Sequence, residues 1–199
     1  GISGILGGIG LGIAMISFIY SITNTSAAIT LLCLAAMPFF TALIAFLFLK
    51  EQITVNVWIS IIIATIGIVI MAIGNTEESS LVGFIFGITS SIGFAVFSVT
   101  LRWRKETPKF TTVAVAGLFC SLFATLMIII SDQVFFSSSY NGSLFSLHGT
   151  LVCLGLILYS IGSKAIPAAE LTLLSLTEVI GGIFWVWLPL FGINEVPDT

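Results

Sequence analysis

Residues 36–51 read AMPFFTALIAFLFLKE, an apolar run that contains one proline and stops at the charged pair Lys50 and Glu51. The run is the second part of an apolar segment that begins at residue 26. A helix needs about 20 mainly apolar residues to cross the hydrocarbon core of a bilayer, which is about 30 Å thick. The segment 26–49 meets that length, so we expect it to cross a membrane.

The rest of the chain repeats this pattern of apolar segments joined by short polar connections. The segments that we expect to be helices are 1–20, 26–49, 55–74, 81–101, 110–130, 144–163 and 168–191. Helices are favoured because a segment in lipid must satisfy its backbone hydrogen bonds without water. Strands of a membrane barrel would be about 10 residues long with alternating polarity, and the segments do not alternate. The sequence therefore predicts an all-α fold, a polytopic transmembrane bundle with seven helices present.

The composition agrees with a membrane protein and argues against other partners. Charged residues make up 8% of the chain and the mean hydropathy is +1.21, whereas soluble domains carry about 25% charged residues. The net charge of −3 provides no polybasic patch, so we do not expect nucleic acid as a partner. The three cysteines lie inside apolar segments without CxxC spacing, and we interpret them as small apolar residues rather than metal ligands.

The basic residues predict the orientation of the bundle. All six Lys and Arg residues fall in the connections 50–54, 102–109 and 164–167, which are alternate connections along the chain. Cytoplasmic loops of membrane proteins collect Lys and Arg, and translocated loops do not. We therefore predict that these three connections are cytoplasmic and that successive segments cross the membrane in opposite directions.

Two stretches of the chain are weakly similar to each other. The residues from Tyr20 read YSITNTSAA and those from Tyr159 read YSIGSKAIPAA, each followed by an apolar run. The offset is 139 at the tyrosines and 144 at Glu51 and Glu195, so five inserted residues bring the copies into register. Tyr20 follows an outward segment and Tyr159 an inward one, and inverted repeats are typical of secondary transporters. For the tyrosines themselves we favour a role as anchors at the membrane interface.

The run from Ala36 to Glu51, followed by residues 59–73, resembles the EamA-type domain of the drug/metabolite transporter superfamily. The resemblance implies ten helices in two inverted halves of five. On this mapping, residues 1–74 supply helices three to five of the first half and residues 81–199 supply helices six to nine of the second. We therefore expect a fragment that lacks the first two helices and the last.

The second half departs from the family pattern at two points. Val179 stands where the family often has proline, and no basic residue precedes Glu195. The register of the second half is therefore looser than that of the first. The resemblance also implies a bacterial inner (plasma) membrane and small metabolites or drugs as substrates, and it names no particular substrate.

Glu178 is the residue that most directly suggests transport chemistry. It lies about ten residues into the segment 168–191, where a carboxylate near the bilayer centre costs about 2.5–3.5 kcal/mol on insertion scales. We expect it to face the bundle interior or a watery cavity, with Ser175, Gly182 and Trp185 at helical spacing beside it. Trp185 could stack on an organic or cationic ligand. Glu178 would then exchange protons with the solute; a protonated carboxyl bonded to a neighbouring helix explains it equally well.

Pro38 and small residues mark the other side of the candidate path. A proline within a helix removes one backbone hydrogen bond and bends the helix, and Thr41 lies on the same face of the segment as Pro38. The freed carbonyl could line a substrate path, or the bend could only shape the bundle. Glycines spaced by four residues occur at 4, 8 and 12 and at 83 and 87. We interpret them as close helix packing, with sliding helix faces as the alternative.

These features predict a secondary transporter that moves small organic metabolites or drugs, with proton coupling as an option. The alternative is a channel or a structural membrane subunit without coupling. An enzyme is not expected, because one histidine and no metal-ligand or nucleophile set is poor equipment for catalysis. The expected partners are the lipid bilayer and a small-molecule solute, no cofactor or metal is expected, and a homodimer is left open.

Overall fold

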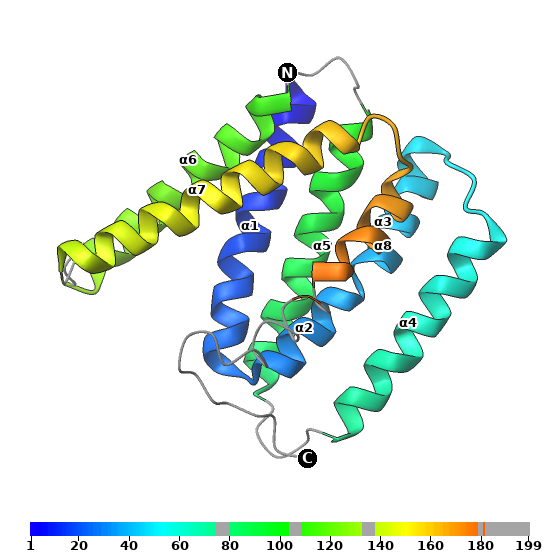
Figure 1. The fold of residues 1–199 in the computed structure, drawn as a ribbon, viewed down its shortest axis with the longest axis horizontal. Helices are drawn as coiled ribbons and strands as arrows, with labels where there is room; N and C mark the ends of the chain where they lie inside the picture. The colour runs from blue at the N-terminus through cyan, green and yellow to red at the C-terminus, as the bar shows by residue number, and fades with distance from the viewer. Residues whose placement is uncertain (75–79, 104–108, 133–137, 179–180, 182–199) are drawn as a thin grey trace.

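The computed structural model describes the chain outside residues 75–79, 104–108, 133–137, 179–180 and 182–199, and the described part is helical (Figure 1). Its elements are α1 (Ile2–Asn24), α2 (Ala27–Ala35), α3 (Met37–Ile44), the π-helix η1 (Ala45–Leu49), α4 (Val55–Gly74), α5 (Leu81–Trp103), α6 (Lys109–Ile130), α7 (Ser139–Gly162) and α8 (Ala168–Ser175). Among the described residues, five stretches are long and apolar enough to cross a membrane: Ile2–Asn24, Ile29–Leu49, Leu81–Trp103, Phe110–Ile130 and Ser139–Gly162. The predicted all-α membrane bundle is confirmed.

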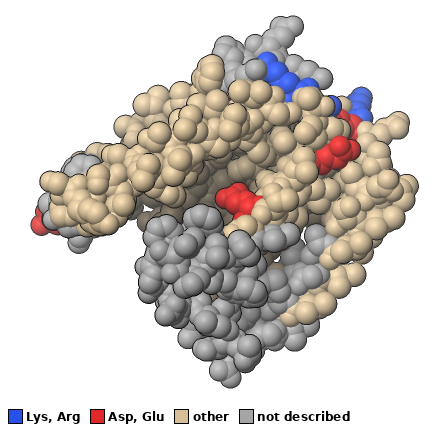
Figure 2. Space-filling view, in the orientation of Figure 1, with Lys and Arg blue, Asp and Glu red and all other residues tan. Residues whose placement is uncertain are grey.

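Successive segments run in opposite directions through the bundle. Figure 1 shows that η1, α5 and α7 all end near the N-terminus, while α1 and α4 end at the opposite side of the molecule. The Lys and Arg side chains that are visible in Figure 2 gather at the first of these two ends. The described bases thus share one end of the molecule, and the side of the membrane on which this end lies stays a prediction.

The two central helices, α1 and α5, are in backbone contact where two glycines meet. A Cβ atom on Gly93 would lie 2.6 Å from the carbonyl oxygen of Gly10, and one on Gly10 would lie 3.0 Å from the carbonyl oxygen of Gly93. Lipid is as apolar as a leucine side chain, so helices in a membrane gain most from close approach at small residues. This crossing fixes α1 against α5 at the centre of the molecule.

The glycines singled out in the sequence also pack closely, against other helices. Added Cβ atoms on Gly8 and Gly12 would collide with Val115 and Phe119 of α6, at 2.5 and 2.6 Å. Those on Gly83 and Gly87 would meet Thr25 and Cys33, at 2.6 and 2.7 Å. The interpretation as packing glycines is confirmed at these four positions.

The segment predicted as one helix over 26–49 is broken after α2. Ala36 ends α2, and its N–H donates to the carbonyl of Cys33 at 3.1 Å. Pro38 stands in the first turn of α3 and has no N–H to continue the ladder. The hydroxyl of Ser91 on α5 donates to the same Cys33 carbonyl, at 2.5 Å. The bend predicted from the proline is therefore a one-residue interruption at Ala36, within a stretch, Ile29–Leu49, that is still long enough to cross a membrane.

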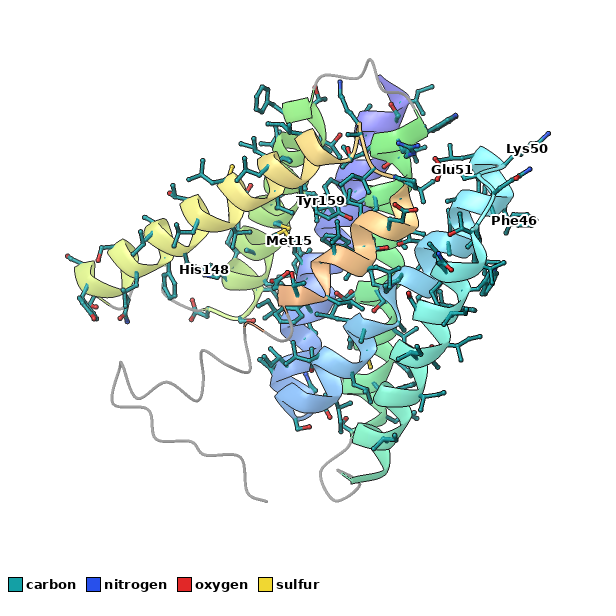
Figure 3. The ribbon with its side chains drawn as sticks, turned by 45° about the vertical axis from the view of Figure 1, so that its right-hand side comes forward. Met15, Phe46, Lys50, Glu51, His148 and Tyr159 are labelled. Carbon is teal, nitrogen blue, oxygen red and sulfur yellow. The ribbon has the colours of Figure 1, made fainter. Side chains whose placement is uncertain are left out.

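α7 begins earlier than predicted. The apolar segment predicts a start at residue 144, and Asn141 and Gly142 just before it are a turn signal. In the structure, the hydroxyl of Ser138 accepts a hydrogen bond from the N–H of Asn141 at 3.2 Å, and the helix starts at Ser139. A side-chain cap of this kind satisfies an N–H group that the first helical turn leaves free. As a result His148 lies well inside the helix (Figure 3).

α6 and α7 lie side by side and leave the bundle at a steep angle to α1 and α5 (Figure 1). In the most apolar 18-residue stretch of each helix, 11% of the residues of α6 and 6% of those of α7 are buried, whereas 50% are buried in α1 and in α5. A surface that is apolar and this exposed suits contact with lipid rather than water.

Candidate functional site

Two helices of similar length are interrupted in the same way. α2 is 9 residues long, and the residue that caps its C-terminus, Ala36, has φ −77° and ψ −9°. α8 is 8 residues long, and the residue that caps its C-terminus, Leu176, has φ −64° and ψ −17°. In both cases the N–H of the capping residue donates to the carbonyl three positions earlier, at 3.1 Å. Each interruption therefore tightens the last turn before the helix stops.

The interruptions also stand at corresponding positions of the two similar stretches. Ala36 follows Tyr20 by 16 residues, and Leu176 follows Tyr159 by 17. Interrupted membrane helices at corresponding positions of two halves are the best pointer to a transporter's binding site. We therefore take the surroundings of these two interruptions as the candidate site.

The structure brings the two interrupted segments together through α3 and α8. Ala45 and Ala168 share one buried cluster, while Ala42 and Ala169 share the next, which Leu173 also contacts. The two helices lie side by side and run in opposite directions (Figure 1). A helix has 3.6 residues per turn. One turn from Ala42 therefore leads to Pro38 on α3, and one turn from Leu173 leads to Leu176 at the end of α8.

Hydroxyl groups on both helices lie in this interface. Thr41 is fully buried, and its hydroxyl donates to the carbonyl of Met37 at 2.9 Å. Thr172 is also fully buried, and its hydroxyl lies 3.1 Å from the carbonyl oxygen of Ala168. Thr172 was not among the predicted residues, although its spacing of one helical turn from Ser175 is a signal for it.

The other predicted site residues that the structure describes differ in how deeply they are buried. Pro38 is buried in α3, and Ser175 is half-buried, with its hydroxyl donating to the carbonyl of Thr172 at 2.7 Å. Glu178 follows the interruption at Leu176 and is exposed rather than packed against the described helices. Figure 2 shows acidic atoms at the surface near the end of α8, beside a hollow below α7. The role of Glu178 stays a prediction.

Two members of the predicted set cannot be placed. Gly182 and Trp185 lie outside the described residues. Among the residues that the structure does describe, no group of three or more His, Cys, Asp or Glu side chains is arranged to hold a metal ion.

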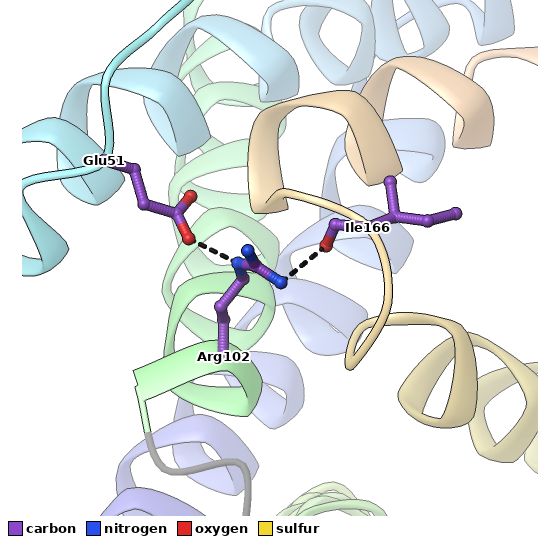
Figure 4. A network of polar contacts seen from close by, with 3 residues as sticks. All are labelled: Glu51, Arg102 and Ile166. Atoms are coloured by element: carbon purple, nitrogen blue, oxygen red, sulfur yellow. Dashed lines mark hydrogen bonds and ion pairs between the residues drawn. The ribbon is translucent and has the colours of Figure 1, made fainter.

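A polar network at the end where the bases gather was not predicted. The Nε atom of Arg102 donates to the carboxylate of Glu51, and its Nη1 atom donates to the carbonyl of Ile166 at 3.2 Å (Figure 4). The side chains of Arg102 and Glu51 are 17% and 23% exposed, so the pair is largely shielded from solvent. The charge pattern of the sequence places both residues at the same end of the bundle, but it does not pair them.

Tyr159 is packed inside the molecule rather than serving as an interfacial anchor. Its ring stacks on Phe97 with a centroid distance of 5.7 Å and meets Phe94 edge-on at 5.3 Å. Its hydroxyl lies 2.7 Å from that of Ser98. Met15 of α1 and Tyr159 of α7, labelled in Figure 3, both pack against the buried cluster that contains Phe97. The interface prediction for Tyr159 was therefore wrong, because α5 offers both an aromatic surface and a hydroxyl partner.

Tyr20 has a related environment at the other end of α5. Its ring stacks on Phe86 with a centroid distance of 5.2 Å, and 37% of the residue is exposed. Both tyrosines therefore stack on phenylalanines of α5, from the last turns of α1 and of α7.

Comparison with known proteins agrees with the resemblance. Residues 1–73 match the EamA-like transporter family. A curated protein of Helicobacter pylori (strain J99 / ATCC 700824), described as "Uncharacterized transporter", is 34% identical over 95 residues, which are 48% of this chain and 32% of the relative. A protein of the same description from strain ATCC 700392 / 26695 is 32% identical over 95 residues, with the same coverage. No solved structure matches.

The matched segment thus spans about a third of the length of these relatives, 32% in each case. The family match is confined to residues 1–73, and it includes the run from Ala36 to Glu51 that carries the resemblance.

Proposed function

We propose that this chain forms part of a secondary transporter that carries small organic metabolites or drugs across a bacterial inner membrane. The observation that carries the proposal is the pair of interrupted segments, with Ala36 and Leu176 at corresponding positions and α3 packed on α8. The family match over residues 1–73 and the description of the relatives as transporters support it.

The interruptions provide polar backbone groups inside an otherwise apolar bundle. Pro38 has no N–H to donate to the carbonyl of Leu34, so the regular helical hydrogen bond to that carbonyl is missing, and the N–H of Ala36 is directed at it instead. Free backbone groups at membrane depth are tolerated where they line a cavity. In this proposal Pro38 and Thr41 line one side of the solute path, and Ser175 and Glu178 line the other, together with Gly182 and Trp185.

Glu178 is the proposed coupling residue. A carboxyl group that alternates between its charged and neutral forms can carry a proton in one direction for each solute that moves in the other. The proposal assigns no enzymatic reaction to the chain. The alternative, a channel or a structural subunit, predicts downhill flux or no flux, and neither would respond to the energy of a proton gradient.

Transport by the full-length protein in sealed vesicles tests the proposal. A pH gradient is imposed and a panel of radiolabelled small metabolites is supplied, and uphill accumulation of at least one of them is expected. Glu178→Gln should abolish accumulation driven by the gradient while exchange between identical solutes continues. Glu170→Gln, a matched change in the first turn of α8, should leave accumulation intact. Equal loss in both variants would contradict the assignment of Glu178, and downhill flux alone would favour the channel.

A further inference from the structure

The contacts of Arg102 join three parts of the chain that are far apart in sequence. Glu51 follows η1, Arg102 stands in the last turn of α5, and Ile166 belongs to the turn before α8. The guanidinium group donates to the Glu51 carboxylate and to the Ile166 carbonyl (Figure 4). One side chain of α5 therefore ties together the ends of two other elements, since each contact uses a different nitrogen of the planar group.

An apolar layer lies directly inside this polar layer. It consists of Ala45, Val99 and Ala168, which are 1%, 4% and 1% exposed and which come from η1, α5 and α8. Val99 precedes Arg102 by three residues, or about one helical turn, and Ala168 follows Ile166 by two. The same three elements therefore meet twice, once through charges and once through small side chains.

Glu51 of the polar network and Ala45 of the apolar layer are also linked through the backbone. The N–H of Glu51 lies 3.4 Å from the carbonyl oxygen of Ala45, and Lys50 between them has a left-handed conformation with φ 54°. The turn that carries Glu51 is thereby folded back over the end of η1. Figure 3 shows Lys50 and Glu51 at this end of the molecule.

The contacts in the polar network and in the apolar layer are weak enough to be broken during a transport cycle. A partly shielded ion pair contributes little net stability, because the cost of removing both charges from water offsets much of their attraction. The two alanines of the layer beneath have small side chains and bury little area, so parting them also costs little. The larger side chains that pack against this layer, Ile44 and Leu49, come from α3 and η1, the same segment as Ala45.

The elements that Arg102 holds lead directly to the two interruptions. α3 and η1 run from the interruption at Ala36 to Glu51, and α8 runs from Ile166 to the interruption at Leu176. Short rigid helices that end at an interruption can swing as units about it. We propose that the Arg102–Glu51–Ile166 network and the Ala45–Val99–Ala168 layer are the gate that closes this end of the solute path, and that the gate opens when Arg102 releases Glu51. The inference rests on the proposed transport function.

The gate is tested by the reactivity of a thiol in the apolar layer. In the full-length protein, every native cysteine, including Cys33, Cys120 and Cys153, is replaced by alanine, and Ala168→Cys is introduced. A water-soluble maleimide should label this position slowly, because Ala168 is 1% exposed. Arg102→Gln should raise the labelling rate several-fold. Exchanging the charges, with Glu51→Arg and Arg102→Glu together, restores an ion pair but not the bond to Ile166, because a carboxylate has no proton to donate. The rate should therefore return part of the way to that of the parent.

Two controls make the result specific. Lys164→Gln removes a base from the turn that also contains Ile166 and should leave the rate unchanged. A thiol at the exposed position 52, introduced as Gln52→Cys, should react at the same rate with and without Arg102→Gln. Should Arg102→Gln prevent folding, Glu51→Gln removes the ion pair while Arg102 keeps its contact with Ile166, and a smaller acceleration is expected.

An unchanged labelling rate at position 168 in both Arg102→Gln and Glu51→Gln would overturn the gate, as would a charge exchange that leaves the rate at the level of Arg102→Gln. The measurement needs no solute. If no solute accumulates in the vesicle assay, the proposed function is contradicted, but the labelling rate at position 168 still reports whether this end of the protein opens. The failure of the gate and the failure of the transport function are therefore distinguishable.

Discussion

The hydroxyl oxygens of Tyr159 and Ser98 lie 2.7 Å apart, and Ser98 donates its own proton to the carbonyl of Phe94 at 2.9 Å. Since Ser98 has one proton to give, Tyr159 must be the donor in the first contact. The end of α7 is therefore tied to α5 by a directional chain of two hydrogen bonds within the bundle.

Replacing Tyr159 with phenylalanine should remove this tie while keeping the aromatic packing. A hydrogen bond contributes about 0.5–1.5 kcal/mol to stability, and side-chain bonds between membrane helices average about 0.6 kcal/mol. We expect a loss in that range in the free energy of unfolding in detergent. Tyr20→Phe is the control, since the hydroxyl of Tyr20 makes only a 3.9 Å contact with the sulfur of Met127. Equal losses in the two variants would contradict the prediction.

Gly93→Ala should destabilise the crossing of α1 and α5. The added Cβ atom would lie 2.6 Å from the carbonyl oxygen of Gly10, and backbone atoms cannot move aside as a flexible side chain can. Overpacking of this kind costs about 1–3 kcal/mol. Gly155→Ala on α7 has open space around it and should instead stabilise by up to about 1 kcal/mol, the gain of alanine over glycine in a helix. Thermal denaturation of both variants should show shifts of opposite sign.

Ser138→Ala should loosen the first turn of α7. The Ser138 hydroxyl accepts from the N–H of Asn141, and loss of such a cap costs about 1 kcal/mol. Faster amide hydrogen exchange is expected at residues 140–142, without change further along the helix. Ser146→Ala removes a hydroxyl that bonds back to the carbonyl of Gly142 within the helix, and it should leave the exchange of the first turn unaffected.

Pro38→Ala separates the shape of the interruption from its role in transport. Alanine would supply an N–H that can donate to the carbonyl of Leu34, so α2 and α3 could join into one helix. We expect the stability to stay the same or rise, and solute flux in vesicles to fall. Full flux in a variant shown to have a continuous helix would argue that the interruption only shapes the bundle.

Labelling of single thiols tests the orientation predicted from the basic residues. In a background without native cysteines, Gln52→Cys and Trp103→Cys should react with an impermeant reagent from the cytoplasmic side, and Asp132→Cys from the other. All three positions are exposed. Labelling of position 52 and position 132 from the same side would disprove the alternation of the segments.

The membrane-spanning segments could be predicted from the sequence because hydropathy is a sum over about 20 residues, and single misplaced residues do not change it. The interruption near Pro38 was partly predictable for a different reason, since a proline lacks its N–H in any surroundings. The start of α7 was missed because the Ser138 hydroxyl caps the helix by accepting from the N–H of Asn141. Asn141 and Gly142 therefore lie in the first turn of the helix and do not form a loop turn.

The contacts of the site were harder to predict. Every face of these helices is apolar, so periodicity does not say which face meets another helix and which meets lipid. Nothing in the order of residues therefore paired Arg102 with Glu51, Ser91 with the carbonyl of Cys33, or Tyr159 with Ser98. Each of these pairs joins α5 to a distant segment, and only the three-dimensional path of the chain brings them together.

The π-helix η1 has a consequence for how insertions and deletions would act on this chain. A π-turn amounts to one surplus residue inserted into an α-helix, and η1 spans Ala45–Leu49, immediately before Lys50 and Glu51. Deleting one residue there would restore an ordinary helix, and because the wide turn absorbs the surplus residue, the residues that follow would keep nearly the same orientation. The carboxylate of Glu51 would then still face Arg102. A variant shortened by one residue within η1 should therefore keep both its helix and its ion pair.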